Sequence, residues 1–167
     1  MPTDAKYFPS SGYLDNKPKN IPNIFCQAWW YCDEEIKNTI EALEPGRHRF
    51  YPFALRSSKK GDVRANLFII HALEPIEAID VDRSPVLWKD GDVLEVPQET
   101  RSTRPSKKYE NYAVLKPDYP KDRHIWRDTR VETPNGIFIS DHLHSIFKQT
   151  PNICVSYMPL WEADKLG

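Results

Sequence analysis

Two stretches of this chain carry apolar residues at helical spacing, while most other apolar positions alternate in the manner of strands. In the first helical stretch, Ile36, Ile40 and Leu43 recur three or four positions apart and therefore share one helix face. Asp33 precedes them as a suitable N-cap, because a carboxylate accepts a hydrogen bond from an N–H group that the first turn leaves unpaired. Pro45 ends the pattern. The sequence predicts a helix between Asp33 and Pro45.

The second helical stretch follows Ser140. The Ser140 hydroxyl is expected to cap a helix from Asp141 to Lys148. This helix would bury Leu143, Ile146 and Phe147, which share one face. Both helices are expected to be short, because 15 prolines divide the chain into brief segments.

The remaining apolar segments favour short strands. The expected strands cover residues 24–31, 47–55, 65–73, 76–81, 112–115, 124–130, 137–139 and 153–158. Lys59-Lys60-Gly61-Asp62 is typical of a turn between the second and third strands, so a β-hairpin is predicted there. Consecutive strand residues face opposite sides, so Trp29 and Trp30 cannot both enter one core, and one of them is a candidate partner contact. The pattern indicates an α+β fold with a mostly antiparallel sheet and two or three short helices.

The two helical units correspond when the sequence is shifted by 107 residues. The shift lays Asp33 on Ser140, Ile36 on Leu143, Ile40 on Phe147, Phe50 on Tyr157 and Pro52 on Pro159. A genuine repeat would pack two similar helix–strand units on one sheet. Identity across this register is low, however, and any two amphipathic helix–strand units look alike. Coincidence is the favoured interpretation.

Length and local composition indicate one domain with two irregular segments. A chain of 167 residues has the size of a single domain. Residues 1–22 contain four prolines and predict a surface arm, followed by a single α+β domain over 23–167. The expected aromatic anchors of the arm are Tyr7, Phe8 and Tyr13. Within the domain, the polar and basic segment 97–110 predicts a mobile loop.

The overall charge is nearly balanced, which argues against some classes of partner. Lys and Arg number 23, Asp and Glu number 24, and the pI is about 6.5, whereas sequence-independent nucleic-acid binding needs a basic surface. No window approaches the roughly 18 consecutive apolar residues of a membrane span. Cys26, Cys32 and Cys154 lack Cys-x-x-Cys spacing and are expected to be reduced. We therefore expect a cytoplasmic protein that binds neither nucleic acid directly nor a membrane.

The histidines form no recognisable catalytic or metal-binding pattern. His142 and His144 would point about 200° apart on a helix. His124 and Asp128 would share a strand face at a separation of about 13 Å, too far for a hydrogen bond. The sequence also lacks phosphate-binding Gly-rich loops, nucleophile elbows and paired zinc signatures. We expect a non-enzymatic protein without catalytic residues, cofactor or metal; the alternative is a small hydrolase in which the fold unites His124, Asp128 and His142.

An acidic segment is the leading candidate for partner binding. Between Glu74 and Glu99, eight acidic residues accompany only Arg83 and Lys89, a local net charge of −6. Such runs are most often solvated surface, but Trp88 lies among these carboxylates and would anchor a basic protein that the charge attracts. The candidate partner contacts are Asp80, Asp82, Trp88, Asp90 and Asp92, with Trp30 as a second anchor.

Three blocks of the sequence resemble one bacterial protein family. They are residues 40–53 (IEALEPGRHRFYPF), residues 66–70 (NLFII), and residues 124–128 with 138–141 (HIWRD and FISD). In this order, over roughly residues 30 to 150, they are similar to a family of immunity proteins typified by a myxobacterial member. That family is linked to polymorphic and contact-delivered toxin systems, type VI secretion among them.

The resemblance implies a cytoplasmic inhibitor, encoded beside a secreted toxin, that binds the toxin's effector domain. That domain would be a nuclease or another cytoplasmic enzyme. The family has no established catalytic residues, so none can be transferred to this chain. The chain departs from the family after its last helix, where residues 150–154 (TPNIC) replace a Gly-rich segment, so the family does not imply the geometry of the last strand. A toxin-modifying enzyme and an adaptor that loads the toxin onto its delivery machinery are the alternatives.

Overall fold

The computed structural model describes residues 5–13, 19–72, 74–84, 114–129 and 137–155, and the backbone of 88–89, 93–94 and 161–162. Within these ranges two α-helices accompany strands that pair mostly in antiparallel fashion, so the predicted α+β class is confirmed. No helix in the described ranges is long and apolar enough to cross a membrane. The predicted loop over 97–110 lies outside the described residues.

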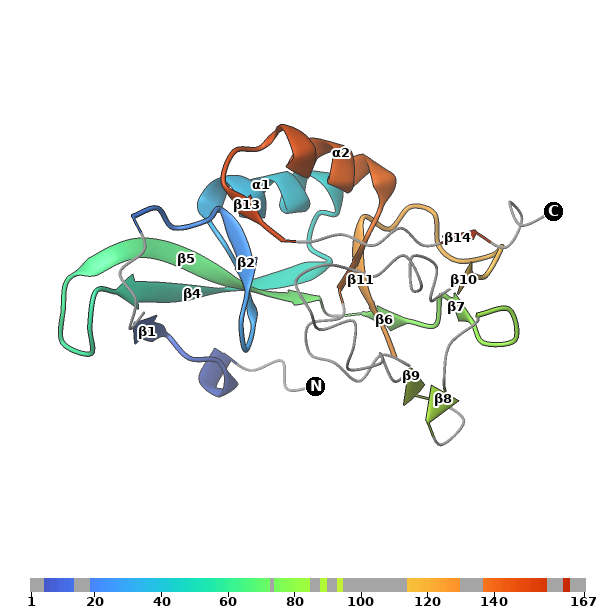
Figure 1. Cartoon of the computed structure of the whole chain (residues 1–167), viewed down its shortest axis with the longest axis horizontal. Helices are drawn as coiled ribbons and strands as arrows, with labels where there is room; N and C mark the ends of the chain where they lie inside the picture. The colour runs from blue at the N-terminus through green and yellow to red at the C-terminus, as the bar shows by residue number, and fades with distance from the viewer. Residues whose placement is uncertain are drawn as a thin grey trace.

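A six-stranded sheet in the order β1-β4-β5-β3-β2-β13 forms the centre of the molecule (Figure 1). Its strands are β1 (Ser11–Tyr13), β2 (Ile24–Cys26), β3 (Trp30–Cys32), β4 (His48–Arg56), β5 (Val63–Ala72) and β13 (Ile153–Cys154). The antiparallel β4–β5 pair is the predicted hairpin, with Tyr51 opposite Ile69. The edge strands β1 and β13 join their neighbours in parallel. Segments far apart in the sequence therefore close the two edges of this sheet.

Both predicted helices form and pack on the same face of the sheet (Figure 1). α1 spans Glu34–Leu43, and the Asp33 carboxylate accepts a hydrogen bond of 2.9 Å from the Ile36 N–H group. α2 spans Asp141–Gln149, and Ser140 Oγ accepts a hydrogen bond of 3.2 Å from the third residue of that segment. Each cap satisfies an N–H group that has no partner inside its helix. Both predicted N-caps are therefore confirmed.

The offset of 107 residues that relates the two caps also relates the elements beside them. It carries β3 onto β12 (Ile137–Ile139) and α1 onto α2. Ile36 and Ile40 then correspond to Leu143 and Phe147, and all four side chains are buried in one cluster between the helices and the sheet. After the helices, the offset carries β4 onto residues 155–163, most of which lie outside the described part of the chain. Two similar strand–cap–helix units thus contribute to one core.

The opposite face of the sheet carries a second core that is rich in aromatic side chains. Tyr51, Phe53 and Leu55 alternate along β4 with residues of the other face, as strand geometry requires. They pack with Leu67 and Ile69 from β5. The β4–β5 hairpin is therefore buried on both faces around Phe50 and Ile70, whereas Pro52 and Asn66, nearer its turn, are exposed.

The N-terminal segment covers this aromatic core. A 3-10 turn, η1 (Ala5–Tyr7), leads to Phe8, which is buried and stacks on Tyr51 with ring centroids 4.1 Å apart. Tyr7 and Tyr13 are instead 57% and 47% exposed. The prediction of an aromatic anchor is confirmed for Phe8 and wrong for the two tyrosines.

Smaller sheets lie beside the main one (Figure 1). Their strands are β6 (Pro75–Ile76), β7 (Ile79–Asp80), β8 (Trp88–Lys89), β9 (Val93–Leu94), β10 (Val114–Leu115), β11 (Ile125–Asp128), β12 and β14 (Trp161–Glu162). The single strand predicted over 76–81 is wrong, because β6 and β7 belong to different sheets. The Asp128 carboxylate causes the break, since its Oδ2 accepts hydrogen bonds from the N–H groups of Ala78 at 2.7 Å and Ile79 at 2.9 Å.

Candidate partner-binding surfaces

The structure describes the first part of the acidic segment. Asp80 lies in β7, and its carboxylate holds the following turn: Oδ1 accepts a hydrogen bond of 3.2 Å from the Arg83 N–H group, and Oδ2 lies 3.8 Å from Arg83 Nε. Asp82 is exposed in that turn. The side chain of Trp88 in β8, and both Asp90 and Asp92, lie outside the described part of the chain. The partner-binding role of these five residues stays a prediction.

Basic residues from a distant part of the chain neutralise much of the described acidic surface. Glu74 pairs with the Arg123 guanidinium, whose hydrogen bond and charge hold the pKa of Glu74 below its ordinary value. Glu77 Oε2 lies 3.9 Å from Lys116 Nζ. Exposed pairs of this kind add little stability, but they cancel charge. The attraction for a basic partner is therefore weaker than the local net charge of −6 implies.

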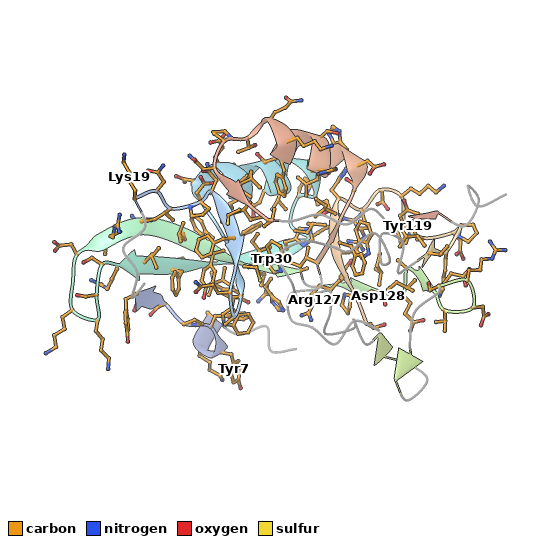
Figure 2. All side chains as sticks on the ribbon, viewed as in Figure 1. Tyr7, Lys19, Trp30, Tyr119, Arg127 and Asp128 are labelled. Carbon is orange, nitrogen blue, oxygen red and sulfur yellow. The ribbon has the colours of Figure 1, made fainter. Side chains whose placement is uncertain are left out.

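The two adjacent tryptophans lie on opposite faces of the main sheet, as strand alternation predicts. Trp30 is half-buried in β3 against the helix-side core, and Figure 2 labels it near the middle of the molecule. Trp29 packs against the aromatic core, with its ring centroid 5.0 Å from that of Phe8. Trp126 of β11 is buried. Trp30 would serve as a partner anchor only through the part of its side chain that the core leaves accessible.

His124 and His142 meet at the start of α2, but Asp128 does not join them. The two imidazole centroids are 5.4 Å apart, and His124 Nδ1 lies 2.8 Å from Ser140 Oγ. Ser140 Oγ also caps α2, which explains its position. Asp128 is buried at the other end of β11, where its carboxylate binds two backbone N–H groups. The hydrolase arrangement of His124, Asp128 and His142 therefore does not form.

A buried carboxylate–imidazole pair escaped the sequence reasoning. Glu44 follows α1 and His48 begins β4, and Glu44 Oε2 lies 2.8 Å from His48 Nε2. The same oxygen accepts a hydrogen bond of 3.0 Å from the Ile125 N–H group of β11. Their spacing of four residues was the available signal. Because the two side chains are only 1% and 4% exposed, the pair is closed to a substrate and instead ties α1, β4 and β11 together.

The described side chains include no group of three His, Cys, Asp or Glu residues that could hold a metal ion. The three cysteines are free. Burial raises the pKa of the half-buried Cys26 thiol to about 11 and raises that of Cys32 as well. These thiols are therefore poor nucleophiles near neutral pH.

These features define a small α+β protein whose described histidines and acids do not come together as the hydrolase arrangement requires. The sequence matches the immunity protein family Imm11 over residues 7–157. The match covers most of the chain, so this protein belongs to that family and the resemblance seen in the sequence is confirmed. No curated protein matches the chain.

The family match also bears on the N-terminal segment. It begins at residue 7, so it includes Phe8, which stacks on Tyr51, and β1, which is the edge strand of the main sheet. The matched region therefore extends into the segment predicted to be a separate arm.

Proposed function

We propose that this chain protects a bacterial cell by binding the effector domain of one cognate toxin and covering its active site or substrate groove. Membership of the immunity protein family over residues 7–157 is the observation that carries the proposal. Neutralisation by binding requires no reactive centre in the inhibitor. It requires a stable scaffold for the binding surface, and the main sheet, with one core on each face, supports this requirement.

Protection would take place in the cytoplasm of the producing cell, against a toxin of a polymorphic system such as one delivered by type VI secretion. A nuclease is one effector that fits this setting. The inhibitor would bind the toxin protein itself rather than its nucleic-acid substrate, since the chain has a net charge of −1.

The acidic segment contributes part of the proposed interface. Asp82 is exposed, whereas Asp80 is half-buried and engaged with Arg83. We therefore assign direct contact to Asp82, and to Trp88, Asp90 and Asp92 further along the segment. Trp30 would be a second anchor.

The proposal is tested by coexpressing this chain with the protein encoded beside it. Restored growth together with a stable one-to-one complex supports neutralisation by binding. Restored growth without a complex indicates an enzyme that modifies the toxin, and a complex without restored growth indicates a loading adaptor. Either of these two results would refute the proposal.

The acidic contacts are tested separately with Asp90→Lys/Asp92→Lys. Losing two acidic groups and gaining two basic ones should slow association with the toxin and sensitise cells, because oppositely charged surfaces steer encounter. Glu34→Lys/Glu35→Lys, at the exposed start of α1, is the control with the same change in net charge. Equal association rates for the two variants at low salt would remove the acidic segment from the interface.

A further inference from the structure

The β4–β5 hairpin projects beyond the rest of the main sheet (Figure 1). Within the described residues, β1 pairs with β4 only over residues 54–56, and β3 pairs with β5 only at residues 68–69. The segment between these pairings, residues 57–67, therefore extends past the flanking strands that the structure describes. Its turn forms one extreme end of the molecule in Figure 1.

The end of the hairpin, residues 56–64, is held in one conformation by its own hydrogen bonds. The Ser57 N–H group donates to the Asp62 carbonyl at 3.0 Å, and the Gly61 N–H group donates to the Ser58 carbonyl at 3.1 Å. The Arg56 guanidinium donates to the Gly61 carbonyl at 3.3 Å. A Cβ at Gly61 would collide with the hydroxyls of the two serines, so the tight turn depends on glycine here. A turn that is already ordered loses little conformational entropy when it binds.

The base of the projection is anchored in the aromatic core. Leu55 and Leu67 are both buried there, one on each strand. The end of the hairpin is thus carried on a rigid support.

The hairpin tip, residues 56–64, is strongly basic although the whole chain is not. It contains Arg56, Lys59, Lys60 and Arg64 but only one acid, Asp62, and so carries +3 while the rest of the chain carries −4. Lys59 and Lys60 are exposed, and no ion pair of theirs appears among the described residues. The acids Glu74 and Glu77, by contrast, are paired with bases. The two exposed lysines therefore give the tip a local positive charge that the printed ion pairs of the described residues do not offset.

Exposed apolar groups lie beside these charges. Val63 is 45% exposed at the start of β5, and Tyr13 of β1 lies opposite Arg56 in the strand register. Together with the lysines they form a mixed basic and apolar surface. Protein interfaces commonly combine an apolar centre with charged groups at the rim.

We propose that the hairpin tip inserts into a concave, carboxylate-lined surface of the toxin's effector domain. This inference rests on the proposed function and adds the chemistry of the partner's surface. A projecting rigid turn fits a groove better than a flat surface, and exposed lysines are attracted to a surface that carries carboxylates. A protein is favoured over a nucleic acid because four basic residues on one turn would contact only a few phosphates, while the rest of the chain repels them.

The charge of the tip is tested with the variant Lys59→Glu/Lys60→Glu. Its binding is measured to the toxin domain encoded by the neighbouring gene, prepared in a catalytically inactive form. Because both lysines are exposed, the variant should fold as the wild type does. Its association rate at low salt should fall about tenfold or more, and the salt dependence of that rate should weaken. The control is Lys121→Glu/Lys148→Glu, which changes net charge equally at exposed positions outside the hairpin and should retain more than half of the wild-type rate.

Carbodiimide crosslinking identifies the partner's chemistry directly. The reagent activates a carboxylate, and attack by a lysine amine forms an amide bond with release of the urea by-product. Crosslinks from Lys59 or Lys60 to Asp or Glu residues of the toxin, found by mass spectrometry, would support the proposal. Crosslinks confined to other lysines in a stable complex would overturn it.

Three further results would refute the assignment. Equal association rates for the hairpin and control variants would remove the tip from the interface while leaving immunity intact. Saturable binding of the wild-type chain to a duplex DNA oligonucleotide, lost in the hairpin variant whose toxin binding is unchanged, would assign the tip to nucleic acid. No toxin binding by the wild type would refute the proposed function, and this inference with it.

Discussion

Replacing Glu44 by alanine should weaken the fold more than any surface charge change. Glu44 Oε2 contacts two groups at once: it lies 2.8 Å from His48 Nε2 and accepts a hydrogen bond of 3.0 Å from the Ile125 N–H group. It is the link between the end of α1, the start of β4 and β11. Alanine would leave the Ile125 N–H group without its acceptor and His48 Nε2 without its partner, both in a closed environment.

The magnitude follows from those two contacts. A buried donor left without its partner costs about 1–3 kcal/mol. Two buried groups losing the same partner together cost about 2–6 kcal/mol. We therefore expect Glu44→Ala to lower the free energy of unfolding by about 2–6 kcal/mol, which for a domain of this size lowers Tm by roughly 4–24 °C. Glu44→Gln keeps an acceptor for the Ile125 N–H group and should lose about 1–2 kcal/mol.

Urea unfolding followed by far-UV circular dichroism measures these differences at constant pH. Glu41→Ala is the matched control, because Glu41 lies exposed on the same helix and should change stability by less than about 0.5 kcal/mol. A Glu44→Ala protein within about 1 kcal/mol of the wild type would refute the reasoning. Equal losses for Glu44→Gln and Glu44→Ala would show that the accepted hydrogen bonds are not the source of the effect.

Three other predictions concern the titratable and reactive side chains. Burial, and then the charges of Arg127 and Arg49, lower the pKa of His71 below 6.5. Below that pH the unfolded chain therefore binds the proton more readily than the folded chain, and the free energy of unfolding falls. His71→Phe should reduce this pH-dependent loss of stability, measured by chemical denaturation between pH 7.5 and 5, and an unchanged pH profile would contradict the prediction. Iodoacetamide at pH 7.5 should label the exposed Cys154 well before Cys32, whose pKa burial raises; equal labelling rates by mass spectrometry would show that Cys32 is accessible. His124→Ala/His142→Ala should still protect cells in the coexpression assay, whereas lost protection by a stably folded variant would favour an enzyme.

Local signals in the sequence were sufficient for the helices and the central hairpin. Asp33 and Ser140 were recognised as caps because capping involves only the next three residues. The β4–β5 hairpin was recognised from its turn and its flanking apolar runs. In both cases the interactions that decide the structure lie close together in the sequence.

Contacts between distant segments account for what the sequence did not predict. The strand expected over 76–81 is divided because Asp128, about fifty positions later, accepts hydrogen bonds from two N–H groups within it. The acidic segment is partly neutralised by Arg123 and Lys116, which charge counting along the chain could not reveal. Likewise, the hairpin tip could be recognised as a projecting basic surface only once its flanking strands were placed. Sequence reasoning therefore overestimated the uncompensated charge of the acidic segment and overlooked the basic hairpin tip.

The burial of the β4–β5 hairpin on both faces has a consequence for how this protein can evolve. The buried side chains of residues 50–53 and 67–70 belong to two cores, so most substitutions of them would be removed by selection for folding. The exposed side chains of the turn, Lys59 and Lys60 among them, belong to neither core, so substitutions there cost the fold little. New recognition properties can therefore arise at the turn without loss of stability. A lineage of such proteins could follow a changing toxin by altering a few codons while the scaffold stays the same.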